Sequence, residues 1–192
     1  LKKGDYLFKA GKRKFLRIVA KYDTPMRIFK KLFSQLNANH VRYMVVGGIA
    51  VNLYGIERAT ADIDIVLALD KGNLHGFIEV AKALGLKPKI PVRLDDLSND
   101  QKRKEWAEAK NMTVFSLYDP KNPFLILDVF IEEPFDFKGA YEFRKKFKFE
   151  DITIPVVPVK ELIAMKEKTG RPQDEADAFH LKKIMREWKN EK

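Results

Sequence analysis

Two aspartates begin a run of the sequence that is predicted to be a β-strand, and their spacing would let both carboxylates act at one site. Asp62 and Asp64 begin the run 62–67, DIDIVL, and they project from one face because side chains repeat every two residues on a strand. Adjacent carboxylates raise each other's pKa unless a cation lies between them. The pair therefore predicts a Mg²⁺ or Mn²⁺ site with oxygen ligands. The alternative is that the two acids mark the exposed end of an edge strand.

A third aspartate lies in a similar setting. Asp128 is the only charged residue in the apolar, β-prone run 124–131. A lone buried carboxylate is costly unless it is paired or binds a metal ion. An ion pair with one of the many lysines and arginines is the alternative. Three acids on two neighbouring strands predict a two-metal site for phosphoryl transfer.

A glycine pair precedes these acids in the chain. Gly47 and Gly48 follow the apolar run 43–46, and a short helix is expected to begin near Ile49. Without a Cβ atom, the backbone N–H groups of both glycines can approach a ligand closely. The positive end of the helix dipole favours a phosphate at the same point.

These features occur in an order that resembles a known superfamily. Gly47-Gly48, then Asp62-x-Asp64, then Asp128 is similar to the nucleotidyltransferase domain of the DNA polymerase β superfamily. More narrowly, GGIAVNLYG followed by the run 58–64, RATADID, resembles small stand-alone nucleotidyltransferases related to the AbiEii and AbiGii toxins of abortive-infection systems. The resemblance implies that the glycine turn holds the triphosphate of a nucleotide and that the three acids hold two divalent metal ions.

The C-terminal part of the chain carries a second set of candidate residues. A helix that contains Lys166 is followed by the turn and helix start 170–177, GRPQDEAD, which places Arg171, Asp174 and Asp177 around the break. This pattern resembles the C-terminal part of the same family, in which a helical lysine and the aspartate after the turn belong to the active-site motifs. Lys166 can offer charge to the triphosphate, and Asp174 can orient that lysine or act as general base. The alternatives are a helix cap and an ion pair within one helix.

Two residues upstream of Asp62 complete the predicted nucleotide site. Arg58 would steady negative charge together with Lys166. Thr60 would either donate a hydrogen bond to a phosphate or simply fill a strand edge.

The predicted fold is α+β, a two-layer arrangement with a mixed sheet, helices packed on it and a C-terminal helical segment. The 192 residues, 45% of them hydrophobic, suffice for one sizeable core. We expect a basic segment at 1–22, a nucleotidyltransferase core at 23–157, and C-terminal helices at 158–192 that complete the active site. Other expected elements are helices at 24–38, 72–84 and 99–109, the last capped by Ser98, and a hairpin of strands 112–118 and 124–131.

Composition restricts the classes of partner and compartment. The net charge of +10 favours a nucleoside triphosphate, RNA or DNA, although interspersed charges of both signs also suit a heat-adapted surface. The absence of cysteine excludes disulfides, thiolate zinc sites and a cysteine nucleophile. No apolar run approaches the roughly 18 residues of a membrane span, and no N-terminal stretch has the features of a secretory leader. These observations predict a cytoplasmic protein.

Three functions remain in competition. The first is an enzyme that moves a nucleoside monophosphate from a triphosphate to an acceptor hydroxyl, on an RNA or tRNA 3′ end, a protein or a small molecule. The second is a catalytically silent protein of the same fold that binds nucleotide or RNA, with a protein antitoxin as partner. The third is a plain RNA-binding module that uses 1–22 and 135–149, where aromatic and basic residues alternate. The three intact acids favour the enzyme.

Overall fold

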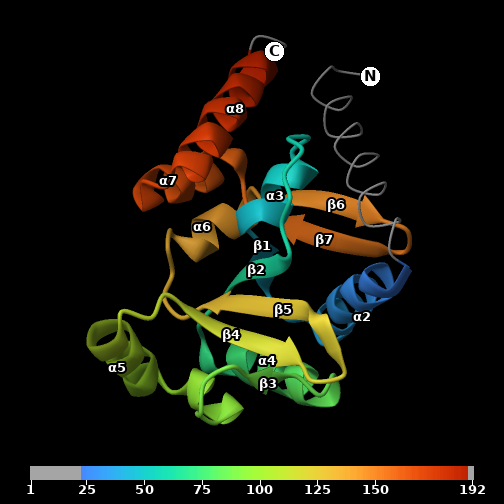
Figure 1. The fold of residues 1–192 in the computed structure, drawn as a ribbon, viewed down its shortest axis with the longest axis vertical. Helices are drawn as coiled ribbons and strands as arrows, with labels where there is room; N and C mark the ends of the chain where they lie inside the picture. The colour runs from blue at the N-terminus through green and yellow to red at the C-terminus, as the bar shows by residue number, and fades with distance from the viewer. Residues whose placement is uncertain (1–22, 190–192) are drawn as a thin grey trace.

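The computed structural model describes residues 23–189, which form a mixed seven-stranded sheet and seven α-helices (Figure 1). Residues 1–22, predicted to be a basic segment, lie outside the described residues. The helices are α2 (Asp23–Ala38), α3 (Gly47–Leu53), α4 (Lys71–Ala83), α5 (Asp100–Lys110), α6 (Phe137–Glu142), α7 (Val159–Thr169) and α8 (Pro172–Lys189), with a short 3₁₀ helix η1 (Leu94–Ser98) before α5. The strands are β1 (Tyr43–Val45), β2 (Asp62–Leu67), β3 (Lys87–Pro88), β4 (Val114–Asp119), β5 (Asn122–Phe130), β6 (Lys145–Phe149) and β7 (Ile152–Val156).

The strand that carries Asp62 and Asp64 lies in the middle of the sheet. The strand order is β3-β4-β5-β2-β1-β7-β6, so three strands lie on each side of β2. β2 pairs antiparallel with β1 and parallel with β5. The alternative that the two acids mark the end of an edge strand is therefore wrong.

One face of the sheet is a closed apolar layer. Helix α2 packs there through Phe29, whose ring lies 6.4 Å from that of Phe149 on β6. Helix α5 packs there through Trp106, whose ring stacks on Phe115 of β4 at 5.3 Å. Both aromatic contacts join residues that are almost fully buried. Burial of this apolar surface is the main stabilising term of the fold.

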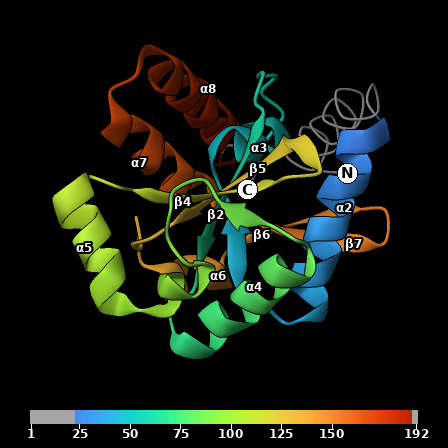
Figure 2. The same ribbon diagram turned by 60° about the horizontal axis from the view of Figure 1, so that its bottom comes forward.

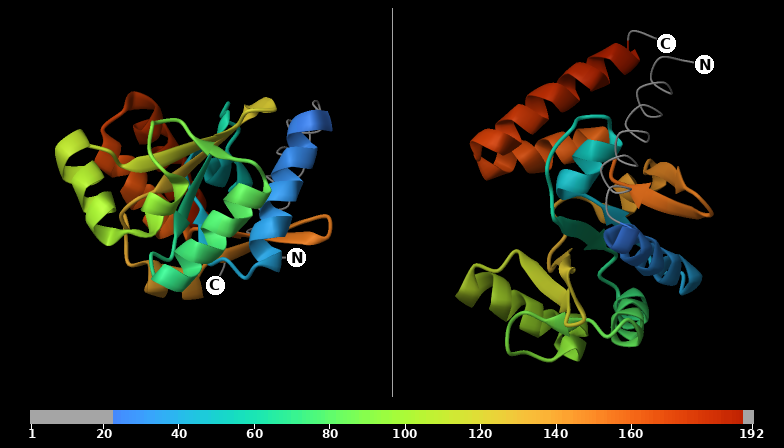
Figure 3. Two further views of the ribbon diagram at one scale, coloured as in Figure 1. Left: turned by 90° about the horizontal axis from the view of Figure 1, so that it is seen from below. Right: turned by 45° about the vertical axis from the view of Figure 1, so that its right-hand side comes forward.

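The opposite face carries the three acids. Helix α3 packs against β2 on this side, and Tyr54, directly after α3, donates a hydrogen bond of 2.7 Å to the Val157 carbonyl. In Figure 2, α3, α7 and α8 lie on one side of the sheet and α4 on the other. The right-hand view of Figure 3 shows the α7–α8 pair at one end of the molecule, with α4 and α5 at the other.

Several predicted elements are confirmed. α2 ends at Ala38 as expected, and its buried stripe of Phe29, Leu32, Phe33 and Leu36 faces the core. α4 is followed by Gly85 in a left-handed conformation, with φ of +75°. β4 and β5 form the expected antiparallel hairpin, although both strands begin two residues from the predicted positions.

The region before β4 differs from the prediction. Asn99, rather than Ser98, caps α5, because its side chain accepts hydrogen bonds from the N–H groups of Gln101 and Lys102. Ser98 instead closes η1 by donating to the Asp95 carbonyl. Arg103 on α5 is buried, and its guanidinium donates a hydrogen bond to the Leu97 carbonyl.

The segment 135–149 is a helix followed by a strand. Phe137, Phe147 and Phe149 are buried in the core, so these aromatic rings are not presented to a nucleic acid. The strand in this segment is β6, and its antiparallel pairing with β7 was not predicted. β7 in turn lies parallel to β1. In residues 23–189, no helix combines the length and the apolar character needed to cross a bilayer.

Candidate active site

The register of β2 and β5 brings two of the acids together. Asp64 lies directly opposite Asp128 on the neighbouring parallel strand, while Asp62 lies opposite Ile126. Because side chains alternate along each strand, all three carboxylates project from the same face. The expectation that the three acids lie on two neighbouring strands is confirmed, with Asp128 directly opposite Asp64 and Asp62 two residues earlier on β2.

The surroundings of Asp64 oppose its ionisation. Burial, together with the nearby charges of Asp128 and Asp62, raises the pKa of Asp64 from 3.8 to about 6. The charge of Lys166 and a hydrogen bond from the Gly48 N–H act in the opposite direction, but they do not cancel this effect. A proton or a cation would relieve the crowding of negative charge at this point.

Asp128 leaves one oxygen atom without a partner. Its Oδ1 is buried and accepts no hydrogen bond, and within residues 23–189 its carboxylate forms no ion pair. The alternative in which a lysine or arginine pairs with Asp128 is therefore not what the described residues show. In the same part of the chain, no three His, Asp or Glu side chains already stand in a geometry that would hold a metal ion. The partnerless oxygen is nonetheless of the type that a hard cation prefers.

The two glycines fit tightly against the site. Helix α3 starts at Gly47, two residues before the expected start, so both glycines belong to its first turn. A Cβ atom on Gly47 would lie 1.9 Å from Asp64 Oδ2, and one on Gly48 would lie 2.6 Å from Thr60 Oγ1. Gly47 also has φ of +61°. These positions thus require glycine so that Asp64 and Thr60 can approach the helix start.

The substitution Gly47→Ala is expected to displace Asp64 and to lower stability by more than backbone strain alone. A non-glycine residue at positive φ costs about 1–3 kcal/mol. Gly170→Ala is the matched control, because Gly170 has φ of +64° but a Cβ atom added there would meet nothing within 4 Å. Urea unfolding of both variants measures the difference. Equal losses of stability would mean that contact with Asp64 does not matter.

Four charged side chains from three parts of the chain form a second, buried cluster. The Lys166 ammonium on α7 lies 2.5 Å from Asp174 Oδ1 and 3.0 Å from Asp177 Oδ2, both on α8. Arg58 contacts Asp177 and lies 3.7 Å from Asp174 Oδ1. Lys166 and both aspartates are each at most 7% exposed. We call these four residues the ion cluster.

The ion cluster differs in membership from the predicted one. The bond between Lys166 and Asp174 joins two helices, so the alternative of an ion pair within one helix is wrong. Arg171 is exposed and Arg58 takes its place. Asp177, which was predicted to lie near the break but was given no role, belongs to the cluster, and the spacing of Asp174 and Asp177 puts both on one helix face.

Asp174 is held as a carboxylate. Burial raises the pKa of Asp174, but the hydrogen bonds that it accepts from Lys166 and Thr169 outweigh this effect, and its pKa lies below the usual value. The Thr169 hydroxyl donates to Oδ2 at 2.7 Å. A carboxylate with both oxygens occupied and a lowered pKa is a weak proton acceptor.

Asn52 connects helix α3, which begins with the two glycines, to Arg58 of the ion cluster. Its side chain accepts a hydrogen bond of 2.8 Å from the Arg58 N–H and donates one of 2.9 Å to the Arg58 carbonyl. This buried clamp fixes the segment that runs from α3 to β2 and carries Arg58 and Thr60. The sequence did not predict these hydrogen bonds, because a single asparagine on a short helix can bond to many different groups.

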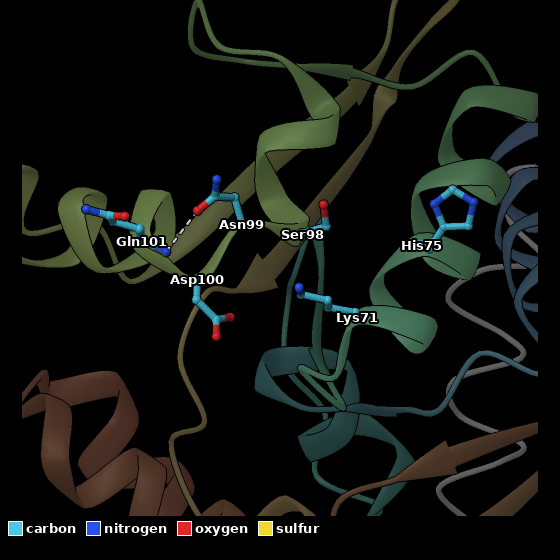
Figure 4. A pocket seen from close by; sticks show the side chains of 6 residues that line it. All are labelled: Lys71, His75, Ser98, Asn99, Asp100 and Gln101. Carbon is cyan, nitrogen blue, oxygen red and sulfur yellow. Dashed lines mark hydrogen bonds between the residues drawn. The ribbon is translucent and has the colours of Figure 1, made fainter.

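A separate cavity of about 680 Å³ lies away from the acids. It is lined by Lys71, His75 and the segment 98–101, where α4 faces the start of α5 (Figure 4). Lys71 follows the C-terminal end of β2, whereas Asp62 and Asp64 lie at its N-terminal end. The cavity therefore includes none of the predicted site residues.

Comparison with known proteins places this geometry in context. Residues 32–169, well over half of the chain, match the family model for the nucleotidyl transferase AbiEii toxin of type IV toxin–antitoxin systems. A search of curated proteins found no match.

Three solved structures share the fold at low sequence identity. The lincosamide antibiotic adenylyltransferase LnuA, with lincomycin bound, aligns with a TM-score of 0.53 at 17% identity, covering 81% of this chain and 96% of LnuA. TM1012 from Thermotoga maritima, assigned as a nucleotidyltransferase, aligns with a TM-score of 0.50 at 16% identity, covering 87% and 93% of the two chains. ANT(2")-Ia, in complex with adenylyl-2"-tobramycin, aligns with a TM-score of 0.53 at 11% identity, covering 85% and 94%.

Proposed function

Because the chain belongs to the AbiEii nucleotidyltransferase toxin family, we propose that it transfers a nucleoside monophosphate from a nucleoside triphosphate to an acceptor hydroxyl, releasing pyrophosphate. The observation that carries the proposal is the pairing of Asp64 with Asp128 across neighbouring strands, beside the glycine start of α3. Crowded carboxylates without a cationic partner at Asp128 are costly in a purely structural role.

The acids fit a divalent cation. Asp64 and Asp128, which are direct neighbours, would hold Mg²⁺ or Mn²⁺ together with Asp62, which projects from the same face of β2. The partnerless Oδ1 of Asp128 supports this assignment. When bound, the ion would neutralise charge on the triphosphate and lower the pKa of the attacking hydroxyl.

The remaining residues would bind the triphosphate. Gly47 and Gly48 allow phosphates to approach the start of α3 closely. The Gly48 N–H, which donates a hydrogen bond to Asp64, would donate to a phosphate oxygen instead. Thr60 would donate a hydrogen bond from its exposed position. Arg58 and Lys166 supply positive charge. The charge of Lys166 acts on Asp64 as well, since it lowers the pKa of that carboxyl. Since Asp174 is a weak proton acceptor, we assign it the positioning of Lys166 rather than the role of general base.

The chemical step is an in-line displacement at the α-phosphorus. The acceptor oxygen forms a new bond to that phosphorus, and the bond to the oxygen bridging the α- and β-phosphates breaks, so that pyrophosphate leaves with the electron pair. The hydroxyl proton passes to a carboxylate of the site, and Asp128, which forms no ion pair within residues 23–189, is suited to accept it. The acceptor is an RNA or tRNA 3′ end, a protein or a small molecule. A protein antitoxin, which the toxin–antitoxin system named in the family description supports, and a cytoplasmic location complete the proposal.

A labelling experiment tests the proposed function. The protein is incubated with each α-phosphate-radiolabelled nucleoside triphosphate, Mg²⁺ or Mn²⁺ and a whole-cell extract, and label is sought in RNA, protein and small molecules. We expect label with wild type and with Asp151→Asn, an exposed acid in the β6–β7 turn, but none with Asp128→Asn. Nucleotide binding without label in any fraction would favour the catalytically silent alternative. Label that survives Asp128→Asn would contradict the assigned site.

A further inference from the structure

We propose that the sheet face continuing outward from Asp128 over β4 and β3 is a platform for the single-stranded 3′ end of an RNA acceptor. The acceptor platform consists of Lys87, Lys89, Ser116 and Tyr118. This inference rests on the proposed function and names the acceptor class for the same site. In Figure 1, β3 and β4 extend the sheet beyond β5.

The sheet register places the platform in line with the acids. Ser116 on β4 lies opposite Asp128 on β5, and Asp128 lies opposite Asp64 on β2. The Lys89 N–H donates a hydrogen bond of 2.9 Å to the Ser116 carbonyl, which extends the same row by one more strand. Since adjacent strands lie about 4.8 Å apart, Lys89 begins about 10 Å from Asp128. A chain lying along this row would have its end at the acids.

The second row of the platform runs parallel to the first. Lys87 on β3 lies opposite Tyr118 on β4, and Tyr118 lies opposite Ile126 on β5. Because Tyr118 is two residues from Ser116, both side chains project from the face that carries Asp128. The platform therefore presents two lysines, a hydroxyl and an aromatic ring on one surface.

This face is open although its reverse is closed. Phe115, Leu117 and Leu127 on the reverse are fully buried beneath α5 and the neighbouring helices. Ser116 and Tyr118 are only half-buried, and Lys87 and Lys89 are exposed. An uncovered half of a sheet face beside a reactive site has room for a substrate.

The charges on the platform select an anion. Within residues 23–189, neither Lys87 nor Lys89 forms an ion pair, and the exposed Lys121 in the β4–β5 turn adds a third cation nearby. The chain as a whole carries a charge of +10. Phosphates of a nucleic acid strand match spaced lysines.

The uncharged platform residues favour RNA over a peptide. A half-exposed tyrosine between cations can stack on a base of any sequence, as single-strand binding surfaces do. The Ser116 hydroxyl has no hydrogen-bond partner among the described residues and lies beside Asp128, where it can bind a ribose hydroxyl. The terminal ribose would thus rest next to the acid that receives its proton.

The test measures binding of a short single-stranded RNA, labelled at its 5′ end, by fluorescence anisotropy over a range of salt concentrations. Each phosphate contact with a single strand contributes about 0.7 to the slope of log K against log[salt]. Lys87→Gln/Lys89→Gln should therefore lower that slope by about 1.4. Tyr118→Ala should weaken binding roughly tenfold with little change of slope. Lys104→Gln/Lys110→Gln, which removes the same charge from exposed positions on α5, should leave both quantities near the wild-type values.

Two further readouts separate failure of the platform from failure of the proposed function. Binding of nucleoside triphosphate by calorimetry should be unchanged in the platform variants, whereas labelling of RNA should fall in parallel with RNA affinity. Equal slopes for the two double variants, or label that reaches only protein or small molecules, would overturn the platform while leaving nucleotidyl transfer in place. Platform-dependent RNA binding without any transfer would support the platform and count against the proposed function.

Discussion

Replacing Asp64 with asparagine is expected to abolish nucleotide transfer and to leave the fold intact. Asp64 lies at the centre of the site. It is opposite Asp128, it accepts a hydrogen bond from Gly48, and it packs against the start of α3 at Gly47. Loss of several kcal/mol of charge stabilisation at the transferring phosphate corresponds to a rate loss of about a thousandfold or more. Transfer of labelled nucleotide measures this loss, and Asp151→Asn is the control for removal of one exposed carboxylate.

The same substitution is expected to stabilise the metal-free protein above neutral pH. The pKa of Asp64 is raised to about 6 in the folded state, against an ordinary value of 3.8. The folded state thus holds the proton more tightly than the unfolded chain does, so stability falls as the pH rises from about 4 through 6 and stays lower above that range. A shift of about two pKa units corresponds to at most about 3 kcal/mol. Asparagine does not ionise and avoids this loss.

Urea unfolding in the presence of a chelator tests the prediction. Asp64→Asn should be more stable than wild type at pH 8, with a smaller difference at pH 5. Adding Mg²⁺ should stabilise wild type and reduce the advantage of the variant, because a ligand that binds only the folded state shifts its stability. A variant that is less stable than wild type at pH 8 in chelator would show that Asp64 is neutralised by a partner within the fold.

The sequence could predict the acids because their evidence is local. The alternation in 62–67 places Asp62 and Asp64 on one face whatever the strand pairs with, and Asp128 is conspicuous inside an apolar run. The β4–β5 hairpin follows from one short turn. Local signals of this kind need no knowledge of the rest of the chain.

Contacts between distant segments could not be predicted in the same way. The parallel pairing of β2 with β5 and of β7 with β1 depends on connections that no short motif specifies. Arg58 and Asp177 are separated by 119 positions, and neither has a sequence context that points to the other. The early start of α3 depends on the approach of Asp64 and Thr60 to the glycines, which only the folded sheet provides.

The ion cluster joins these distant segments, and breaking it is expected to have a large effect on stability. Lys166→Met would leave Asp174 and Asp177 buried with only Arg58 to balance two carboxylates. Removal of one partner from a buried ion pair typically costs about 3–5 kcal/mol. Urea unfolding at neutral pH measures the loss. Lys182→Met is the matched control, because Lys182 pairs with Glu167 between the same two helices at 2.5 Å, but these side chains are 44% and 48% exposed. Its loss should therefore cost less than about 1 kcal/mol.

A second substitution distinguishes loss of charge balance from loss of packing. If the cost arises from unpaired negative charge, then Asp174→Asn added to Lys166→Met should recover part of the stability, giving a coupling energy in a double-mutant cycle. If the two losses simply add, the ion cluster stabilises the fold through packing alone.

The ion cluster also makes the free energy of unfolding depend on pH in the acid range, because the pKa of Asp174 is lowered in the folded state. Its contribution is present above the ordinary pKa of 3.8 and is lost as the pH falls through the lower, folded value. Wild type should therefore lose stability below about pH 4 more steeply than Asp174→Asn does, and parallel curves would show that Lys166 and Thr169 do not hold Asp174 as a carboxylate.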